Sequence, residues 1–249
     1  MNYLVQTDLF NVPAQDYGYA VMRAVDEFNW YYGSDVHRVT NWRSTQFDPA
    51  DLNTGTIPVG SVEFCLAWYR QMGKGLVRPL NIPDALKPML QRDLVEGTEL
   101  EDDGRKWYGK DKDVIKASWN GVFEQYHGSH NMQFTIYDDS ILAEWRCFVC
   151  EGEIADVRCY SGDPWLLPDK EYCTEAAKRL GETNPAFTLD VAVYMDGHTD
   201  IIECHDFFAC GLYGFEDSRL LLKMLKHTQR HLLLTLPDTR KKAEMRRIR

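Results

Sequence analysis

The stretch that decides the fold covers residues 188–217 and reads TLDVAVYMDGHTDIIECHDFFACGLYGFED. It predicts two strands joined by Asp196 and Gly197, because this dipeptide between β-rich runs is a strong signal for a two-residue hairpin turn. A two-residue loop fixes the register, and Asp190 then lies opposite Glu203 on one face of the sheet. Two carboxylates this close repel each other unless something neutralises them.

A magnesium ion is the simplest neutralising group, because Mg²⁺ is usually held by one or two carboxylates and completes its shell with phosphate and water. His205 follows Glu203 by two residues and therefore lies on the same face of the strand. The hairpin thus predicts a metal site of Asp190, Glu203 and His205 beside a nucleotide. The alternative is a solvated acidic face without a function, and a three-residue loop would place Asp190 opposite Cys204.

The composition limits the classes of partner. The chain has 249 residues and a net charge of −10, enough for one large domain or two small ones. An acidic body argues against broad nucleic-acid binding. Residues 239–249 hold six cations and one anion, and this basic C-terminal tail is typical of a solvated terminus.

Seven cysteines are scattered along the chain without the spacing of a disulfide framework. Cys147 and Cys150 have CxxC spacing, but a zinc site needs about four ligands and no second pair accompanies them. The first residues lack the features of a signal peptide, and no apolar run reaches the ~20 residues that span a bilayer. These observations predict a reduced, cytoplasmic protein with no membrane partner.

Two domains are expected from the order of the elements. Residues 1–90 alternate strands with helices, which indicates a small α/β domain. Residues 91–238 contain short β-rich pieces and two helices, one with Asp169 as its N-cap, which indicates an α+β domain with an antiparallel sheet. Within it, residues 91–104 are acidic and are expected to form a loop, whereas residues 114–118 are expected to form a strand.

Phosphate-binding glycine loops are absent from the sequence, so a nucleotide would be held by side chains on a sheet. The run WYGKDKDVIKASWNG contains Lys110, Lys112 and Lys116, which could contact phosphates as point charges. A KDKD run is also typical of a solvated loop. Glu144 and Arg146 lie two residues apart, hence on one strand face, and either form an ion pair or contact a ribose and a phosphate.

The order of these pieces resembles the ATP-grasp superfamily, and within it the small ligase-like clade named for replacing an active-site arginine with lysine. GSVEF (residues 60–64) resembles the end of the pre-ATP-grasp domain of that clade. WYGKDKDVIKASWNGV, SILAEWRCFVCEGEI and LDVAVYMDG…IIECHDFFACGLYG resemble three of its successive motifs. The resemblance covers the chain from about residue 56 onward. It implies an ATP-grasp fold over residues 91–238, preceded by a pre-ATP-grasp α/β domain.

The resemblance also implies roles for individual residues. Catalysis is assigned to three cations: Lys116, Arg146 and Arg158, the last facing an acyl phosphate. Binding of ATP is assigned to side chains and to backbone near adenine in the strand around residues 133–137: Lys110, Lys116, Phe134, Thr135, Ile136, Glu144 and Arg146. Binding of Mg²⁺, or of Mn²⁺, is assigned to the hairpin: Asp190, Glu203 and His205.

Two positions depart from the family pattern. His205 stands where asparagine is usual, and imidazole is a poorer ligand for Mg²⁺ than an amide oxygen. The site would then act through water, favour Mn²⁺ or be weakened. Asp111 stands where proline is common after the first lysine. Neither departure removes the two carboxylates.

The activity implied by the resemblance is an ATP-dependent, ADP-forming carboxylate–amine ligase that makes an amide or peptide bond through an acyl phosphate. Its substrates would be a small-molecule or peptide carboxylate and an amine. One alternative is a non-catalytic ATP-grasp protein that binds nucleotide. Another is a nucleotidyl-transferring polynucleotide ligase with a K-x-D-G lysine, but the nearest string, Lys116 to Gly121, has the wrong spacing.

Overall fold

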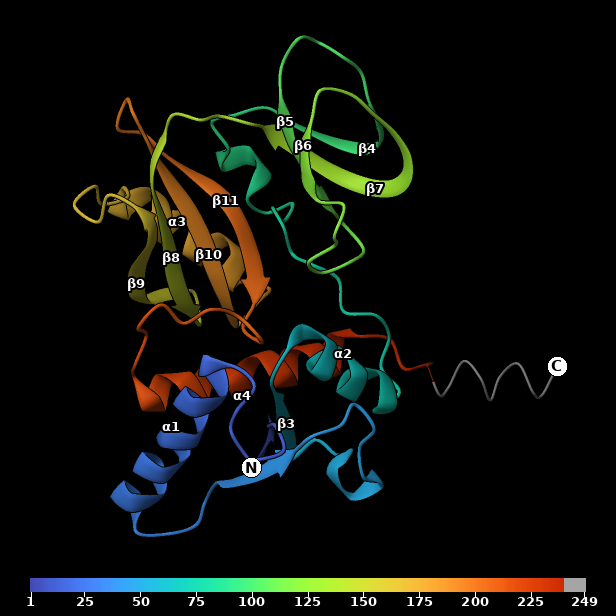
Figure 1. Cartoon of the computed structure of the whole chain (residues 1–249). Helices are drawn as coiled ribbons and strands as arrows, with labels where there is room; N and C mark the ends of the chain where they lie inside the picture. Colours follow the sequence, from blue (N-terminus) through green and yellow to red (C-terminus); the bar gives the residue numbers. More distant parts are fainter. Residues whose placement is uncertain (240–249) are drawn as a thin grey trace, which may run out of the picture. The chain divides into compact units, whose positions relative to one another are not determined.

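A computed structural model describes residues 1–239 of the chain, which divides into two compact units (Figure 1). The first unit combines Met1–Val77 with the chain from Phe207 onward, and the second is Arg78–Asp206. The observed boundaries differ from the expected ones, because the chain returns to the first unit after the hairpin. The basic tail, from residue 240 onward, lies outside the described residues.

The first unit is built on a parallel three-stranded sheet of order β2-β1-β3. This arrangement agrees with the strand–helix alternation of the sequence, since parallel strands need crossover connections. Its elements are β1 (Asn2–Gln6), α1 (Asp16–Tyr32), β2 (Arg38–Trp42), the 3₁₀ helix η1 (Pro49–Asp51), β3 (Thr56–Val59), α2 (Val62–Gln71) and α4 (Ser218–Thr235).

Helix α4 belongs to the first unit because its apolar face is buried there, next to α1 and β3. Asp217 caps its start, and the carboxylate accepts a hydrogen bond of 2.8 Å from the backbone N–H of Leu220. Farther along, the buried amide of Gln229 donates to the carbonyl of Thr56 in β3. Among the described residues, no helix is long and apolar enough to cross a membrane.

The second unit contains two antiparallel four-stranded sheets. We call the sheet of order β4-β7-β5-β6 the lysine sheet and the sheet of order β11-β10-β8-β9 the carboxylate sheet. The lysine sheet consists of β4 (Leu94–Leu100), β5 (Trp107–Asp111), β6 (Gly121–Phe123) and β7 (Tyr126–Ile136). The carboxylate sheet and its flanking helices are β8 (Ile141–Cys150), β9 (Glu153–Gly162), β10 (Ala186–Tyr194), β11 (Thr199–Asp206), α3 (Lys170–Gly181) and the 3₁₀ helix η2 (Lys87–Met89).

Helix α3 covers one face of the carboxylate sheet (Figure 1) and closes a core in which Cys147 and Leu189 are fully buried. As predicted, Asp169 caps the helix, accepting a 2.9 Å hydrogen bond from the N–H of Tyr172. The helix ends at Gly181, where a Cβ atom would come within 2.4 Å of the backbone of Gly152, in the turn between β8 and β9. Because side chains alternate along a strand, the polar residues of β8 and β10 point to the opposite face.

The lysine sheet differs from its expected form at two places. Strand β4 lies in the acidic segment that was expected to be a loop, because the carboxylate of Glu96 is bonded to Lys87 at 2.7 Å and to Lys112 at 3.0 Å. Neutralised in this way, Glu96 is compatible with a sheet position. Conversely, residues 114–118 form part of the loop between β5 and β6 and not a strand.

Candidate functional site

The hairpin of β10 and β11 places Asp190 directly opposite Glu203, as the sequence predicted, but by a different route. The loop is one residue longer than expected, since the N–H of Tyr194 bonds to the carbonyl of His198. This loop pairs Val193 with Thr199 and by itself would bring Asp190 opposite the residue before Glu203. A β-bulge between Asp190 and its neighbour then inserts one extra residue in β11 and restores the carboxylate pair.

Asp190 is held by Arg146 of the neighbouring strand β8. The two residues are cross-strand partners, and the guanidinium donates two hydrogen bonds, Nε to Oδ1 at 2.8 Å and Nη2 to Oδ2 at 2.7 Å. Asp190 is 1% exposed and Arg146 is 6% exposed. A planar fork of this kind is the strongest geometry available to an ion pair, so the orientation of both side chains is fixed.

Glu203 is bonded from two sides. The ammonium of Lys110, from the lysine sheet, donates to Oε2 of Glu203, and Nε2 of His205 lies 3.1 Å from Oε1. Burial alone would raise the pKa of Glu203, but the hydrogen bond and charge of His205 and the charge of Lys110 outweigh it, so the pKa is well below its usual range. Glu203 is therefore an anion at any physiological pH.

The predicted metal ligands lie together at this place. One donor atom from each of Asp190, Glu203 and His205 lies within 4.8 Å of the other two. Two carboxylates and an imidazole suit a divalent cation, and the imidazole shifts the preference from Mg²⁺ toward transition metals such as Mn²⁺. In the absence of an ion, the charges of Lys110 and Arg146 balance the two carboxylates. The donor set therefore fits a divalent metal.

The other predicted residues of the carboxylate sheet flank this cluster. Arg158 is the cross-strand partner of Arg146, but its guanidinium is bonded to Asp156 and its side chain is 39% exposed. Glu144 lies two residues before Arg146 on β8, and it is hydrogen-bonded to Tyr160. Arg146 also lies over the ring of Tyr160, at 5.8 Å. These contacts put one polar surface on the face opposite α3.

The predicted lysines of the lysine sheet separate into three environments. Lys110 lies on β5 and reaches Glu203. Lys112 is bonded to Glu96 and supports the sheet. Lys116 lies in the loop between β5 and β6, is exposed, and has a left-handed backbone with φ of 53°. Of these three lysines, Lys110 is the one whose bond joins the lysine sheet to the hairpin.

Phe134, Thr135 and Ile136 lie in β7, and the structure changes what they can offer. The side chain of Phe134 is fully buried in the core of the lysine sheet. Strand β7 is interior, so its backbone pairs with β4 on one side and with β5 on the other. The backbone groups that were expected to bind adenine are thus used by the sheet. The first backbone past the strand, residues 137–139, is the nearest alternative.

A further network escaped prediction because no motif links its members. The guanidinium of Arg92 donates to Oδ2 of Asp200 at 3.2 Å and to the hydroxyl of Tyr194 at 2.9 Å. Tyr172 donates to Oδ1 of the same fully buried carboxylate at 2.9 Å. These bonds join the segment before β4 and helix α3 to the hairpin, and so hold its turn in place. A buried aspartate next to the turn was the only available signal.

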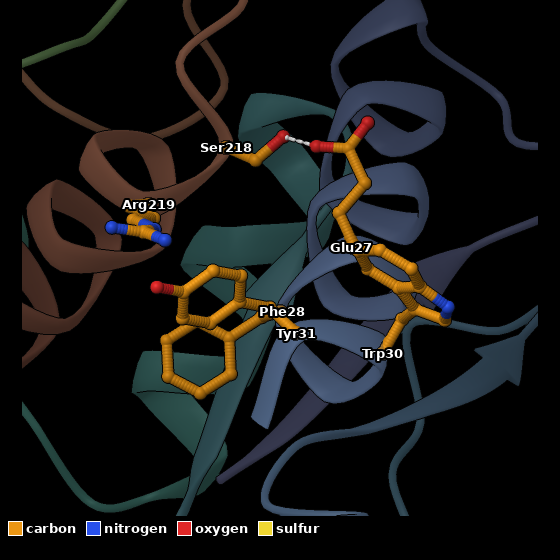
Figure 2. A pocket seen from close by; sticks show the side chains of 6 residues that line it. All are labelled: Glu27, Phe28, Trp30, Tyr31, Ser218 and Arg219. Carbon is orange, nitrogen blue, oxygen red and sulfur yellow. Dashed lines mark hydrogen bonds between the residues drawn. The ribbon is translucent and has the colours of Figure 1, made fainter. Parts of the chain in front are cut away.

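The first unit carries a separate hollow of about 300 Å³ between α1 and α4 (Figure 2). Its charged groups are bonded within the pocket, because Ser218 donates to Glu27 and the guanidinium of Arg219 lies 4.3 Å from the ring centre of Tyr31. The rest of the lining is aromatic, with Trp30 84% exposed. It has one carboxylate and one cation, and lacks the paired carboxylates of the hairpin.

Comparisons with known proteins agree with this geometry. A family model matches residues 131–222 and is described as an ATP-grasp domain, family 2 of the small clade that the sequence motifs resemble. This segment contains Arg146, Asp190, Glu203 and His205 and excludes the lysines of β5 and its loop. No curated protein sequence matches the chain.

Three solved structures are similar over nearly the whole chain. A D-cycloserine synthetase, DcsG, has a TM-score of 0.53 and 10% identity, and the match covers 93% of this chain and 100% of that one. The D-alanine–D-alanine ligase of Bacillus anthracis has a TM-score of 0.51, 11% identity and coverages of 93% and 98%. A RimK-domain ATP-grasp protein of Sphaerobacter thermophilus DSM 20745 has a TM-score of 0.51, 11% identity and coverages of 94% and 100%. The chain therefore has the ATP-grasp fold, of class α+β.

Proposed function

We propose that this protein is an ATP-dependent carboxylate–amine ligase that forms an amide or peptide bond and releases ADP and phosphate. One observation carries the proposal. Lys110 and Arg146, from two different sheets, meet the buried carboxylates Glu203 and Asp190 at one place. Two similar structures are named as a synthetase and a ligase, which supports the same class of reaction here.

The chemistry needs charge neutralisation more than it needs a nucleophile from the protein. In phosphoryl transfer the negative charge is spread over the phosphate oxygens, and catalysis is mostly positioning and electrostatic stabilisation. Lys110, Lys116 and Arg146 would contact the phosphates of ATP. When bound, a divalent cation held by Asp190, Glu203 and His205 would neutralise further phosphate charge.

The reaction would run in two steps. An oxygen of the substrate carboxylate attacks the γ-phosphorus of ATP, the bond to the β-phosphate oxygen breaks, and an acyl phosphate and ADP result. The amine then attacks the acyl carbon, phosphate leaves with the bonding electrons, and the amine loses a proton. Arg158 is placed to contact the acyl phosphate once its bond with Asp156 opens, and Glu144 is placed to accept a ribose hydroxyl. Backbone of residues 137–139 would contact adenine.

The first test is calorimetric titration of the unliganded protein with AMP-PNP, with and without Mg²⁺ or Mn²⁺. We expect binding that depends on the metal and is weakened by at least about tenfold in Asp190→Asn and in Glu203→Gln, because each removes one anionic ligand. Glu153→Gln is the matched control, since it removes an exposed carboxylate at the far end of the same sheet. No binding in the wild type would rule out the proposed site.

The second test identifies the product of slow, metal-dependent ATP turnover. ADP agrees with an acyl-phosphate ligase, whereas AMP, or a covalent AMP–lysine adduct, would overturn the proposal.

A second candidate function is a non-catalytic ATP-grasp protein that binds nucleotide. The observation that favours it is His205, at a position where the resemblance leads one to expect asparagine. Metal-dependent binding of AMP-PNP without ADP formation above that of Glu203→Gln, across a panel of amino acids and dipeptides, would support this candidate.

A further inference from the structure

The loop between β5 and β6, residues 112–120, carries Lys116 but contains no regular element. A loop of this length, with lysine in a left-handed conformation at its tip, has many accessible conformations. Ordering such a loop when a ligand binds reduces affinity. A chain that depends on Lys116 therefore needs a device that holds the loop before the ligand arrives.

The buried carboxylate of Asp111 occupies the centre of this loop. Asp111 is 2% exposed, and its Oδ1 accepts from the N–H groups of Asp113 at 2.6 Å and Val114 at 2.9 Å. Its Oδ2 accepts from Nε1 of Trp119 at 2.9 Å and lies 3.3 Å from Nδ1 of His130. One carboxylate thus binds both the first turn of the loop and its last residues.

The backbone of Asp111 is also bonded to both sides. Its N–H donates to Oδ1 of Asn120 at 2.8 Å, and its carbonyl accepts from Nδ2 of Asn81 at 2.9 Å. The ring of Trp119 stacks on His130 with the centroids 4.1 Å apart. The two ends of the loop are therefore closed onto one residue, which is itself fixed to β7 and to the segment before β4.

We propose that Asp111 is a positioning residue that holds the loop of residues 112–120 in a conformation in which Lys116 is ready to contact the phosphates of ATP. This inference rests on the proposed function, because it assigns Lys116 to the triphosphate. Asp111 itself touches no substrate. Its effect acts on the entropy of the loop, so it should appear in the affinity for the phosphates and not in the affinity for the nucleoside.

The test compares AMP-PNP with adenosine in calorimetric titrations at saturating Mg²⁺. Asp111→Ala should weaken AMP-PNP by about tenfold or more, while adenosine binding stays within about twofold of the wild type. Asp111→Asn should fall between the two, because an amide oxygen still accepts from the N–H groups of Asp113 and Val114. Asp113→Ala is the matched control: it removes a carboxylate of the same loop that is bonded to Arg78 and has a 42% exposed side chain.

A gentler variant, Trp119→Phe, keeps the ring stack on His130 and removes only the donor to Asp111. It should weaken AMP-PNP severalfold, and it keeps the inference testable if Asp111→Ala does not fold. Hydrogen exchange of the unliganded protein gives a second readout, since the N–H of Val114 should exchange faster in both variants.

Three outcomes would overturn the inference. If the wild type binds AMP-PNP and Asp111→Ala binds it equally well, the positioning role fails while the proposed function stands. If Asp111→Ala loses AMP-PNP and adenosine to the same extent, the role is structural only. If the wild type binds neither ligand, the proposed function fails, and the role falls with it.

Discussion

The carboxylate sheet and the lysine sheet belong to one unit, yet they bury very different amounts of apolar side chain. The carboxylate sheet is closed by α3 over a long row of buried residues, and every residue of β10 is buried. The lysine sheet has a core of four buried residues: Leu100, Trp107, Met132 and Phe134. The first sheet fixes its charges through buried ion pairs, and the second holds its charges through half-exposed pairs and a loop.

This difference indicates how the two sheets would divide the roles of a phosphate site. Asp190 and Arg146 gain their fixed orientation from burial, which is suitable for ligands that must keep one geometry. Lys110 and Lys116 lie on a lighter support that can adjust around a substrate. Local stability sets which parts of a protein open first, so we expect the lysine sheet to be the more mobile of the two.

The largest effect should follow from breaking the buried pair of the carboxylate sheet. Arg146→Met should lower the free energy of unfolding by about 3–5 kcal/mol, because it leaves the carboxylate of Asp190 buried without its partner. Lys110→Met removes the corresponding cation of the lysine sheet and should cost about 1 kcal/mol, since Lys110 and Glu203 are partly exposed. Urea denaturation of both variants measures the difference.

The double variant Arg146→Met/Asp190→Leu separates charge from packing. It should recover most of the stability lost in Arg146→Met, because replacing both members of a buried ion pair is often neutral. Equal losses in Arg146→Met and Lys110→Met would contradict the comparison of the two sheets.

A smaller effect should appear in acid and should come from the lysine sheet. Burial raises the pKa of Glu96, but hydrogen bonds from Lys87, Gln133 and Lys112 outweigh it and lower the pKa to about 2. In the unfolded chain the pKa of glutamate is about 4.3. The ionised form therefore stabilises the fold above about pH 4.5, and this contribution is lost as the pH falls toward 2.

The measurement is the urea midpoint of the wild type and of Glu96→Gln from pH 7 to pH 2. The wild type should lose about 1–2 kcal/mol more stability than the variant between pH 5 and pH 2, a value reduced because Glu96 is partly exposed. Glu99→Gln, which changes an exposed carboxylate of the same strand, should follow the wild type. Parallel curves for Glu96→Gln and the wild type would show that the three donors contribute nothing at Glu96.

The sequence predicted those parts of the site that depend on local pattern. The alternation along β10 and β11 put Asp190 and Glu203 on one face, and the register was right at this pair. It was right because two deviations cancel: a longer turn moves the register by one residue, and a bulge at the two isoleucines after Asp200 moves it back. Neither deviation has a signal in the residue types alone.

What the sequence could not predict depends on partners distant in the chain. Strand β4 was taken for a loop because its acidic residues are unfavourable in a strand, and the lysines that neutralise Glu96 come from two other segments. The unit boundary was misplaced because α4 resembles any other amphipathic helix until its buried contact with β3 is known. Asp111 was visible only as a departure from proline, not as the centre of a loop.

The smallest effect concerns the metal and tests whether the fixed geometry of the carboxylate sheet extends to His205. Imidazole favours transition metals over Mg²⁺, whereas an amide oxygen suits Mg²⁺. If His205 is a ligand, His205→Asn should lower the ratio of Mn²⁺ to Mg²⁺ affinity by several-fold, up to about tenfold.

The affinities are measured by calorimetry in the presence of AMP-PNP, with the electron paramagnetic resonance of Mn²⁺ as an independent readout of its ligands. His198→Asn is the matched control, because it removes an imidazole at the turn of the same hairpin, where the ring is bonded to Asp196. A ratio that changes equally in both variants, or in neither, would mean that His205 only neutralises Glu203. The carboxylate sheet would then supply two fixed ligands instead of three.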